Sequence, residues 1–422
     1  MDFFKTMKAS FVVASLLAGC SDSDPPASAD GSIEATTTTV RPDDGTLLVG
    51  AVLPRDGVAA ELGSSMSDAL TLALDEINDA GGVGGTPVRL IEREEGDNEA
   101  TASVAMLELI RLGVDAIIGP TSSTNTLATL STAVDAGVLT CSPTASALAL
   151  DSFPDNGLFI RTIASDSLQA KALAALVERS GTSSTVVVYV DDNYGRPFAE
   201  ATRQAVLAEG TAVTEMVGFT ASEDSVAAAV ASVIATQAEV VVVIADGATG
   251  PAVIAAIDDA STVAMTYVVN DAIRRPATSA QPFGRSLGAR IEGVSPLAYP
   301  TSESFMESLR SVNPATTALF AQNAYDCMNA IALAALAADS DNPVAIARQI
   351  QTVTDAGTPC NSFGACAEVL ATGRQIDYAG PGPVRDLTIG ADGEVLTAVF
   401  ERFTFDADGR DVSNGTITVR DE

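Results

Sequence analysis

The 422-residue sequence contains no histidine, and only three of its residues are lysines. Without histidine the chain lacks the commonest general base, the imidazole of Ser-His-Asp and Cys-His units, and the ligand of most zinc sites. The sequence has 23 Lys+Arg against 55 Asp+Glu, a formal net charge of -32 that would repel nucleic acid. We therefore expect a protein that is not an enzyme and has no metal, no cofactor and no nucleic-acid partner.

Long apolar runs are also missing, because no segment after residue 20 approaches 18 uninterrupted apolar residues. The leader has Lys5 and Lys8 before a short apolar run that closes with Leu17-Ala18-Gly19-Cys20. Small residues directly before a cysteine are typical of a lipoprotein processing site. We predict a lipoprotein signal peptide over residues 1–20, a lipid on Cys20, and an extracytoplasmic location in which the protein is lipid-anchored to the cell membrane. A plain secretory leader or a chance cysteine is the alternative.

Cysteine is scarce, with five residues in the chain. If Cys20 carries lipid, four remain, an even number in an oxidising compartment, which favours disulfides. Cys360 and Cys366 could close a small loop. Cys141 would then pair with Cys327, unless those two are buried free thiols.

The chain divides into a tether and a large globular part. Residues 21–45 are rich in Ser, Asp, Pro, Ala and Thr, and we expect them to form a disordered tether. From Thr46 onward about 377 residues remain, which is enough for two lobes.

Short apolar runs alternate with segments of helical spacing. Strands are expected at 47–53, 88–91, 116–118, 138–141, 185–190, 240–245, 264–269, 395–405 and 416–419, and helices at 66–77, 102–112, 126–134, 169–179, 198–209, 226–236, 253–259, 303–311, 317–337 and 343–353. Alternating strands and helices indicate an α/β fold with parallel sheets. We predict two doubly wound, Rossmann-like lobes joined by several crossings, with residues 46–163 plus 294–385 in the N-terminal lobe and 164–293 plus 386–422 in the C-terminal lobe.

Ligands of such folds bind at the carboxyl ends of strands. Gly119-Pro120-Thr121-Ser122-Ser123 leaves a strand and enters a helix, where free amides, the helix dipole and a hydroxyl would hold a carboxylate. A serine that only caps the helix is the alternative. Ser142-Pro143-Thr144-Ala145-Ser146 ends the next strand, and its carbonyls and hydroxyl could accept an ammonium group. An ordinary turn is the alternative.

Two other motifs have plainer interpretations. Gly81-Gly82-Val83-Gly84-Gly85 follows a helix and precedes a strand, the reverse of a dinucleotide-binding loop, so we expect a helix C-cap and turn. Asp406-Ala407-Asp408-Gly409-Arg410-Asp411 has the composition of a calcium loop but not its spacing, so we expect a hairpin turn.

In their joint order these motifs resemble the leucine-binding type of extracytoplasmic solute-binding protein, the type I receptors of branched-chain amino-acid and amide ABC importers. The similarity runs from about Leu47 to the C-terminal strands. Besides the serine-containing loops and the glycine turn, it is carried by Asp75-Glu76-Ile77-Asn78, Asp191-Asp192-Asn193-Tyr194-Gly195 and Ala324-Tyr325-Asp326.

The resemblance implies roles for individual residues. Ser123 and the amide near it, at Ser122, would bind the ligand α-carboxylate, while the Thr144 carbonyl and the Ser146 hydroxyl would bind its α-ammonium group. Tyr194 would line the cleft and Asp271 would pair with the ammonium, although Tyr194 could be packing and Asp271 a cap.

Two residues depart from the family pattern. Leu62 and Asp246 stand near positions at which leucine binders carry aromatic residues. If Asp246 points into the cleft, a polar or cationic ligand would be favoured over leucine.

These observations predict a monomeric receptor that closes around a small amino acid or related amide and presents it to the permease subunits of an ABC importer. The alternative on the same fold is a ligand sensor, or a receptor for another small polar or cationic solute such as urea, an amide or a polyamine. An enzyme on a Rossmann-like scaffold and a surface adhesion lipoprotein are the candidates from other classes.

Overall fold

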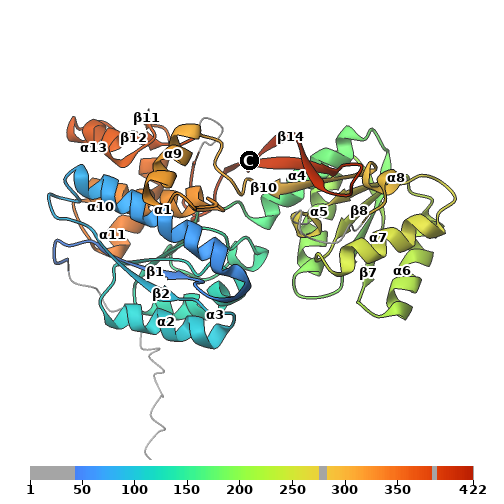
Figure 1. The fold of residues 1–422 in the computed structure, drawn as a ribbon, viewed down its shortest axis with the longest axis horizontal. Helices are drawn as coiled ribbons and strands as arrows, with labels where there is room; N and C mark the ends of the chain where they lie inside the picture. Colours follow the sequence, from blue (N-terminus) through green and yellow to red (C-terminus); the bar gives the residue numbers. More distant parts are fainter. Residues whose placement is uncertain (1–42, 275–282, 383–386, 422) are drawn as a thin grey trace, which may run out of the picture. The chain divides into compact units, whose positions relative to one another are not determined.

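The computed structural model describes residues 43–274, 283–382 and 387–421. The predicted leader, Cys20 and most of the predicted tether lie outside the described residues. The described chain contains two large sheets whose strands are mostly parallel. We call each of these sheets, together with the helices packed on it, a lobe (Figure 1).

The first lobe contains a five-stranded parallel sheet in the order β2-β1-β3-β4-β5. Its strands are β1 (Leu48–Leu53), β2 (Arg89–Glu94), β3 (Ala116–Ile118), β4 (Leu139–Ser142) and β5 (Phe159–Arg161). The connecting helices are α1 (Ala60–Asp79), α2 (Glu99–Arg111) and α3 (Ser123–Asp135). Successive β1 side chains point to opposite faces, so Ala51 packs in the cluster that includes α1, while Val52 packs in the one that includes α2 and α3.

The second lobe contains a seven-stranded sheet in the order β14-β13-β10-β9-β8-β6-β7. Its strands are β6 (Ser184–Val190), β7 (Ala212–Phe219), β8 (Val240–Ile244), β9 (Thr266–Val269), β10 (Ile291–Pro296), β13 (Thr397–Phe405) and β14 (Asp411–Arg420). Helices α4 (Asp166–Arg179) and α5 (Gly195–Ala208) pack on one face, and α6 (Glu223–Thr236) and α7 (Thr249–Ala260) on the other. A short helix, α8 (Arg285–Gly288), precedes β10. Strand β13 runs antiparallel to both of its neighbours, β10 and β14, and the other described pairings of this sheet are parallel.

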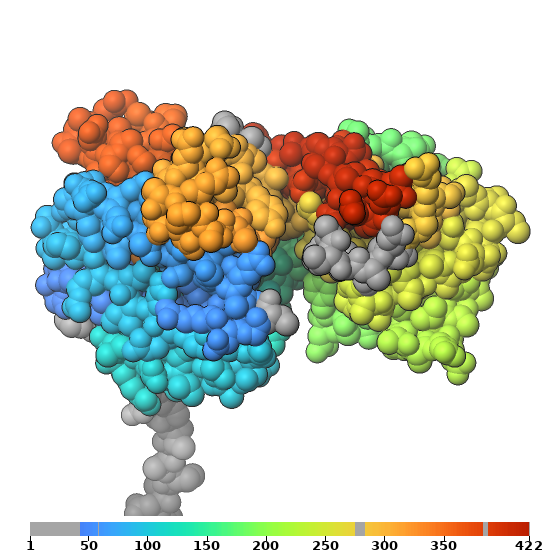
Figure 2. Space-filling model, in the orientation of Figure 1, coloured from blue at the N-terminus to red at the C-terminus, as the bar shows by residue number. Residues whose placement is uncertain are grey.

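After β10 the chain returns to the first lobe. It forms α9 (Glu303–Val312), α10 (Ala321–Ala338), α11 (Pro343–Ala347), α12 (Ile350–Thr354), β11 (Thr358–Cys360), α13 (Phe363–Ala371) and β12 (Ile376–Tyr378). Helices α9 and α10 pack against α1, so the orange and blue segments lie side by side in Figure 2. Every residue of α10 from Ala321 to Ala335 is buried, because small and apolar residues occupy most of its circumference.

Both predicted disulfides are present in the structure. Cys141 of β4 is bonded to Cys327 of α10, and Cys360 of β11 is bonded to Cys366 of α13. The first bond therefore attaches the returning segment to the first sheet. The alternative of buried free thiols at Cys141 and Cys327 is wrong.

The described chain passes between the lobes at residues 162–165 and 297–302 and in the stretch with described residues 379–382 and 387–396, and we call these the first, second and third crossing. The predicted change of lobe at residue 293 falls inside β10, which stays in the second sheet as far as Pro296.

Several elements differ from the sequence prediction. Strand β7 was not predicted, because it lies at a sheet edge with exposed polar residues such as Glu215 and has no continuous apolar run. Strands β10, β11 and β12 and helices α8 and α13 were also not predicted. The helix predicted at 343–353 is interrupted, since the Gln349 amide bonds the Ile346 carbonyl in a tighter turn.

The two glycine-containing turns are as predicted. The amides of Gly81 and Gly82 bond carbonyls of the last turn of α1. The Asp406 carboxylate accepts the amides of Asp408 and Arg410 within the β13–β14 hairpin. Among the described residues, no group of three or more metal-ligating side chains is suited to hold a metal ion. None of the described helices combines the length and apolarity needed to cross a bilayer.

Candidate functional site

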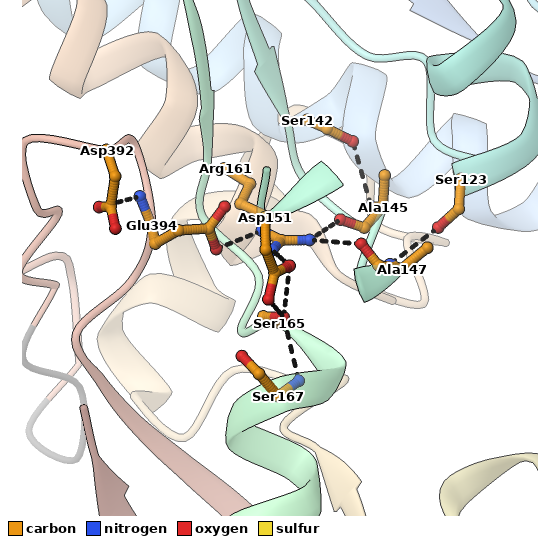
Figure 3. A network of polar contacts seen from close by, with 10 residues as sticks. All are labelled: Ser123, Ser142, Ala145, Ala147, Asp151, Arg161, Ser165, Ser167, Asp392 and Glu394. Carbon is orange, nitrogen blue, oxygen red and sulfur yellow. Dashed lines mark hydrogen bonds and ion pairs between the residues drawn. The ribbon is translucent and has the colours of Figure 1, made fainter. Parts of the chain in front are cut away.

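The serine-containing loops of the first lobe lie side by side at the ends of β3 and β4. Ser122 is the N-cap of α3, and its hydroxyl accepts the Asn125 amide at 3.4 Å. Ser123 begins the helix, and its hydroxyl accepts the Ala147 amide at 3.3 Å (Figure 3). The Thr144 hydroxyl donates to the Thr121 carbonyl at 2.9 Å. The structure therefore brings Ser123 and the 144–147 loop together.

A carboxylate of the protein itself occupies the start of α3. Glu95 follows β2, is 1% exposed, and accepts the amides of Thr121 and Ser122 at 2.9 and 3.0 Å. It also accepts the Thr121 hydroxyl at 2.7 Å and the Asn125 side-chain amide at 3.0 Å. Helix N-termini attract anions, and here Glu95 is the anion. The Thr121 and Ser122 amides are therefore occupied by Glu95. For a ligand carboxylate, the Ser123 hydroxyl remains as a donor.

An open pocket of about 730 Å³ adjoins this helix start. Its lining includes Glu95, Asp97 and Glu99 together with Thr121 and Ser122. The first-lobe half of the candidate site thus has acidic side chains next to its hydroxyls.

The polar residues of the second lobe are joined through Asn270, which is fully buried at the end of β9. Its side-chain amide donates to the Tyr194 hydroxyl at 3.1 Å, and its side-chain oxygen accepts the Ala245 amide at 3.1 Å. The ends of β6, β8 and β9 therefore meet at this one residue. The adjacent Asp271 accepts a hydrogen bond from Gln169 of α4 at 2.7 Å, and burial raises the pKa of its carboxyl.

Asp166, which the sequence analysis did not single out, connects the two halves. It is the first residue of α4, is 3% exposed, and donates its amide to the Ser146 carbonyl at 2.9 Å. Burial and then the charge of Asp271 raise the pKa of the Asp166 carboxyl to about 8, against a smaller opposing effect of a hydrogen bond with the Ser146 side chain. Burial followed by the charges of Asp271 and Asp166 also raises the pKa of the Tyr194 hydroxyl.

Ser146, Asp166, Asp271 and Tyr194 thus form one electrostatically coupled cluster, which we call the acidic cluster. The charge of Asp271 opposes the ionisation of Asp166. A positively charged ligand group placed among them would remove that penalty.

Two predicted site residues have other contacts in the structure. The Asp246 carboxylate accepts the amides of Ala248 and Thr249 at 2.6 and 2.8 Å, so it caps the start of α7. Burial opposes its ionisation, but these bonds and the Thr249 hydroxyl outweigh it and the pKa of Asp246 is lowered. Leu62 of α1 is half-buried and packs against the first-lobe core.

The sequence of residues 46–375 matches the family model described as periplasmic binding protein. The chain belongs to this family. It is 27% identical over 358 residues to the chemotactic signal transduction system substrate-binding protein BasB of Halobacterium salinarum, covering 81% of this chain and 83% of that protein. It is 28% identical over 174 residues to the Leu/Ile/Val-binding protein BraC3 of Rhizobium johnstonii, covering 40% of this chain and 46% of that protein.

Solved structures of the family have the same fold. The ABC transporter substrate-binding protein from Desulfitobacterium hafniense in complex with Leu superposes with a TM-score of 0.66 at 18% identity, covering 87% of this chain and 99% of that one. The branched-chain amino acid transporter protein LivJ from Streptococcus pneumoniae gives a TM-score of 0.62 at 19% identity, with coverage of 89% and 100%. The family resemblance and the two-lobed α/β fold predicted from the sequence are confirmed.

Proposed function

We propose that this protein is an extracytoplasmic receptor that binds a small amino acid or a related amide between its lobes and delivers it to an ABC importer. The acidic cluster carries this proposal. Its residue Ser146 directly precedes Ala147, whose amide is bound by the Ser123 hydroxyl. The Ser123 hydroxyl, as a donor for a carboxylate, and the Asp166 and Asp271 carboxylates, as partners for an ammonium group, support it.

The charges of the site favour a ligand with an ammonium group. Asp166 is buried and Asp271 is half-buried, and desolvation makes the ionisation of both carboxylates costly in the ligand-free protein. An ammonium group would neutralise them, whereas a ligand without a positive charge would leave the penalty in place. The Ser123 hydroxyl then orients the opposite end of the ligand.

The proposal extends to the location and assembly of the chain. A lipid on Cys20 would hold the receptor at the outer side of the cell membrane, where it would work as a monomer together with permease subunits. We propose no catalytic role. The similarity to BraC3, a Leu/Ile/Val-binding protein, supports the ligand class.

A sensor is the second candidate function, and one observation favours it. BasB belongs to a chemotactic signal transduction system, and it matches this chain over most of its length. The acidic pocket beside Ser122 supports a polar or cationic solute, such as urea, an amide or a polyamine, as the alternative ligand.

A thermal-shift screen across amino acids, amides, urea and polyamines tests the proposal. A ligand at about 100 times its Kd should raise the free energy of unfolding by about 2.7 kcal/mol. Stabilisation by an amino acid supports the receptor, and a screen in which no ligand shifts the melting temperature would contradict it. Cells that lack the protein separate transport from sensing. Loss of uptake of the labelled ligand would indicate transport, and loss of the swimming response to the ligand would indicate sensing.

A further inference from the structure

A buried arginine contacts the backbone of residues 145–147, which we call the ligand loop. Arg161 is the last residue of β5, and its side chain is 0% exposed. A guanidinium in the interior requires partners for its five N–H donors, so the contacts of Arg161 show which parts of the chain it connects.

Those contacts reach three separate segments (Figure 3). The first is the ligand loop, where Nη1 donates to the carbonyls of Ala145 and Ala147 at 3.1 and 3.3 Å. Nη2 is paired with the Asp151 carboxylate. Nε donates to the Glu394 carboxylate at 2.6 Å, and Glu394 belongs to the third crossing.

Hydrogen bonds to the backbone of Ser146 and of the residues on either side of it therefore fix the position of the Ser146 hydroxyl. Arg161 takes the carbonyls of Ala145 and Ala147, while the Asp166 amide takes the carbonyl of Ser146 itself. The Ala147 amide in turn is bound by the Ser123 hydroxyl. The position of a residue proposed to contact the ligand thus depends on a buried side chain of β5.

The same network also fixes the crossings. The Ser165 hydroxyl, which caps α4 at the end of the first crossing, donates to both Asp151 oxygens at 2.8 and 2.9 Å. The Arg161 amide donates to the Gly393 carbonyl at 3.0 Å. Gly393 has φ +81° and a Cβ there would lie 2.1 Å from the Phe159 carbonyl oxygen, so the turn of the third crossing lies directly on β5.

We propose that Arg161 is a positioning residue of the ligand site, which holds the 145–147 loop and ties it to Asp151 and Glu394, so that this loop and the first and third crossings move together. The assignment of the loop to a ligand rests on the proposed function. Coupling through such a network requires that a change at one end be felt at the other.

Glu394→Ala is the informative variant. Within the part of the chain that the structure describes, Glu394 reaches the 145–147 loop through Arg161, so a purely local role predicts no change in that loop. The variant is expected to fold, because Arg161 keeps Asp151 as its counter-ion and one buried negative charge is removed. Glu394→Gln retains an oxygen acceptor for Nε and serves as the conservative rescue.

Amide hydrogen exchange in the ligand-free protein provides the first measurement. In Glu394→Ala we expect the amides of Ala145 and Ala147 to exchange at least about fivefold faster than in wild type, a size typical of coupling within one polar network. Glu394→Gln should stay close to wild type. The matched control is Glu292→Ala, which removes a glutamate paired with Arg402 in the second lobe and should leave these two amides unchanged.

Affinity provides the second measurement, with the ligand found in the thermal-shift screen. Glu394→Ala should raise its Kd at least about fivefold, and Glu292→Ala should not. Equal exchange in the two alanine variants would overturn the coupling, and faster exchange with unchanged Kd would overturn the positioning role. If no ligand binds wild type, the proposed function fails while the exchange result still decides the coupling.

Discussion

Asp166→Asn should stabilise the ligand-free protein and weaken ligand binding, two effects of opposite sign from one substitution. Asparagine keeps the size of the side chain and removes its charge. In wild type, burial and the charge of Asp271 together raise the pKa of the Asp166 carboxyl from 3.8 to about 8. The folded state therefore binds this proton more tightly than the unfolded chain does.

The pH dependence follows from that difference. The stabilisation by protonated Asp166 is complete below pH 4 and is lost as the pH rises through 8, since folding then requires a buried negative charge. About four pKa units correspond to a free energy on the order of 5 kcal/mol. The stability of Asp166→Asn relative to wild type should thus increase by that order between pH 4 and pH 8, as denaturant unfolding at several pH values can measure.

Binding gives the complementary result. An ammonium ligand lowers the pKa of Asp166, so wild type should release about one proton per ligand at pH 7, which calorimetry in buffers of different ionisation enthalpy detects. Asp166→Asn should release much less and should bind at least about 30-fold more weakly, because it removes one partner of a desolvated charge pair.

An exposed aspartate provides the control for these measurements. Asp259→Asn, on the surface of α7, should match wild type in stability, proton release and affinity. Ligand binding by wild type without proton release, or equal affinity in Asp166→Asn, would refute the placement of an ammonium group in the acidic cluster.

Two further predictions concern the cysteines. Cys20→Ala should release the protein from membranes in a fractionation experiment, and a variant that remains membrane-bound after normal leader cleavage would exclude the lipid anchor. Replacing both Cys141 and Cys327 by serine should cost about 5 kcal/mol of unfolding free energy, against about 2 kcal/mol for Cys360 and Cys366, because the first bond closes a far longer loop. Equal losses in denaturant unfolding would contradict this order.

The elements that the sequence predicted correctly are those with a strong local signal. The run Val240–Ile244 is apolar throughout and forms a central strand, and the serines after β3 and β4 lie at strand ends where the strand–helix alternation places them. Strand β7 has no such signal, since the exposed polar residues Thr214 and Glu215 interrupt its apolar residues.

The missed site residues depend on contacts distant in sequence. Ser165-Asp166 has the pattern of a capped, solvated helix start, and only the packing of α4 buries the carboxylate near Asp271, more than 100 residues later. Glu95 and Asn270 are also ordinary polar residues after strands. Their roles arise from Thr121 in one case and from Tyr194 and Ala245 in the other.

The path of the chain sets the order in which the lobes can be completed. Helix α10, which covers α1 in the first lobe, follows it by about 240 residues, and β13 and β14 complete the second sheet only at the C-terminal end. A chain emerging from its N-terminus therefore exposes the apolar faces of α1 and β1 until α10 has been synthesised. Neither lobe can close early, and the chain keeps an incomplete core throughout the period in which an exported protein is threaded across a membrane.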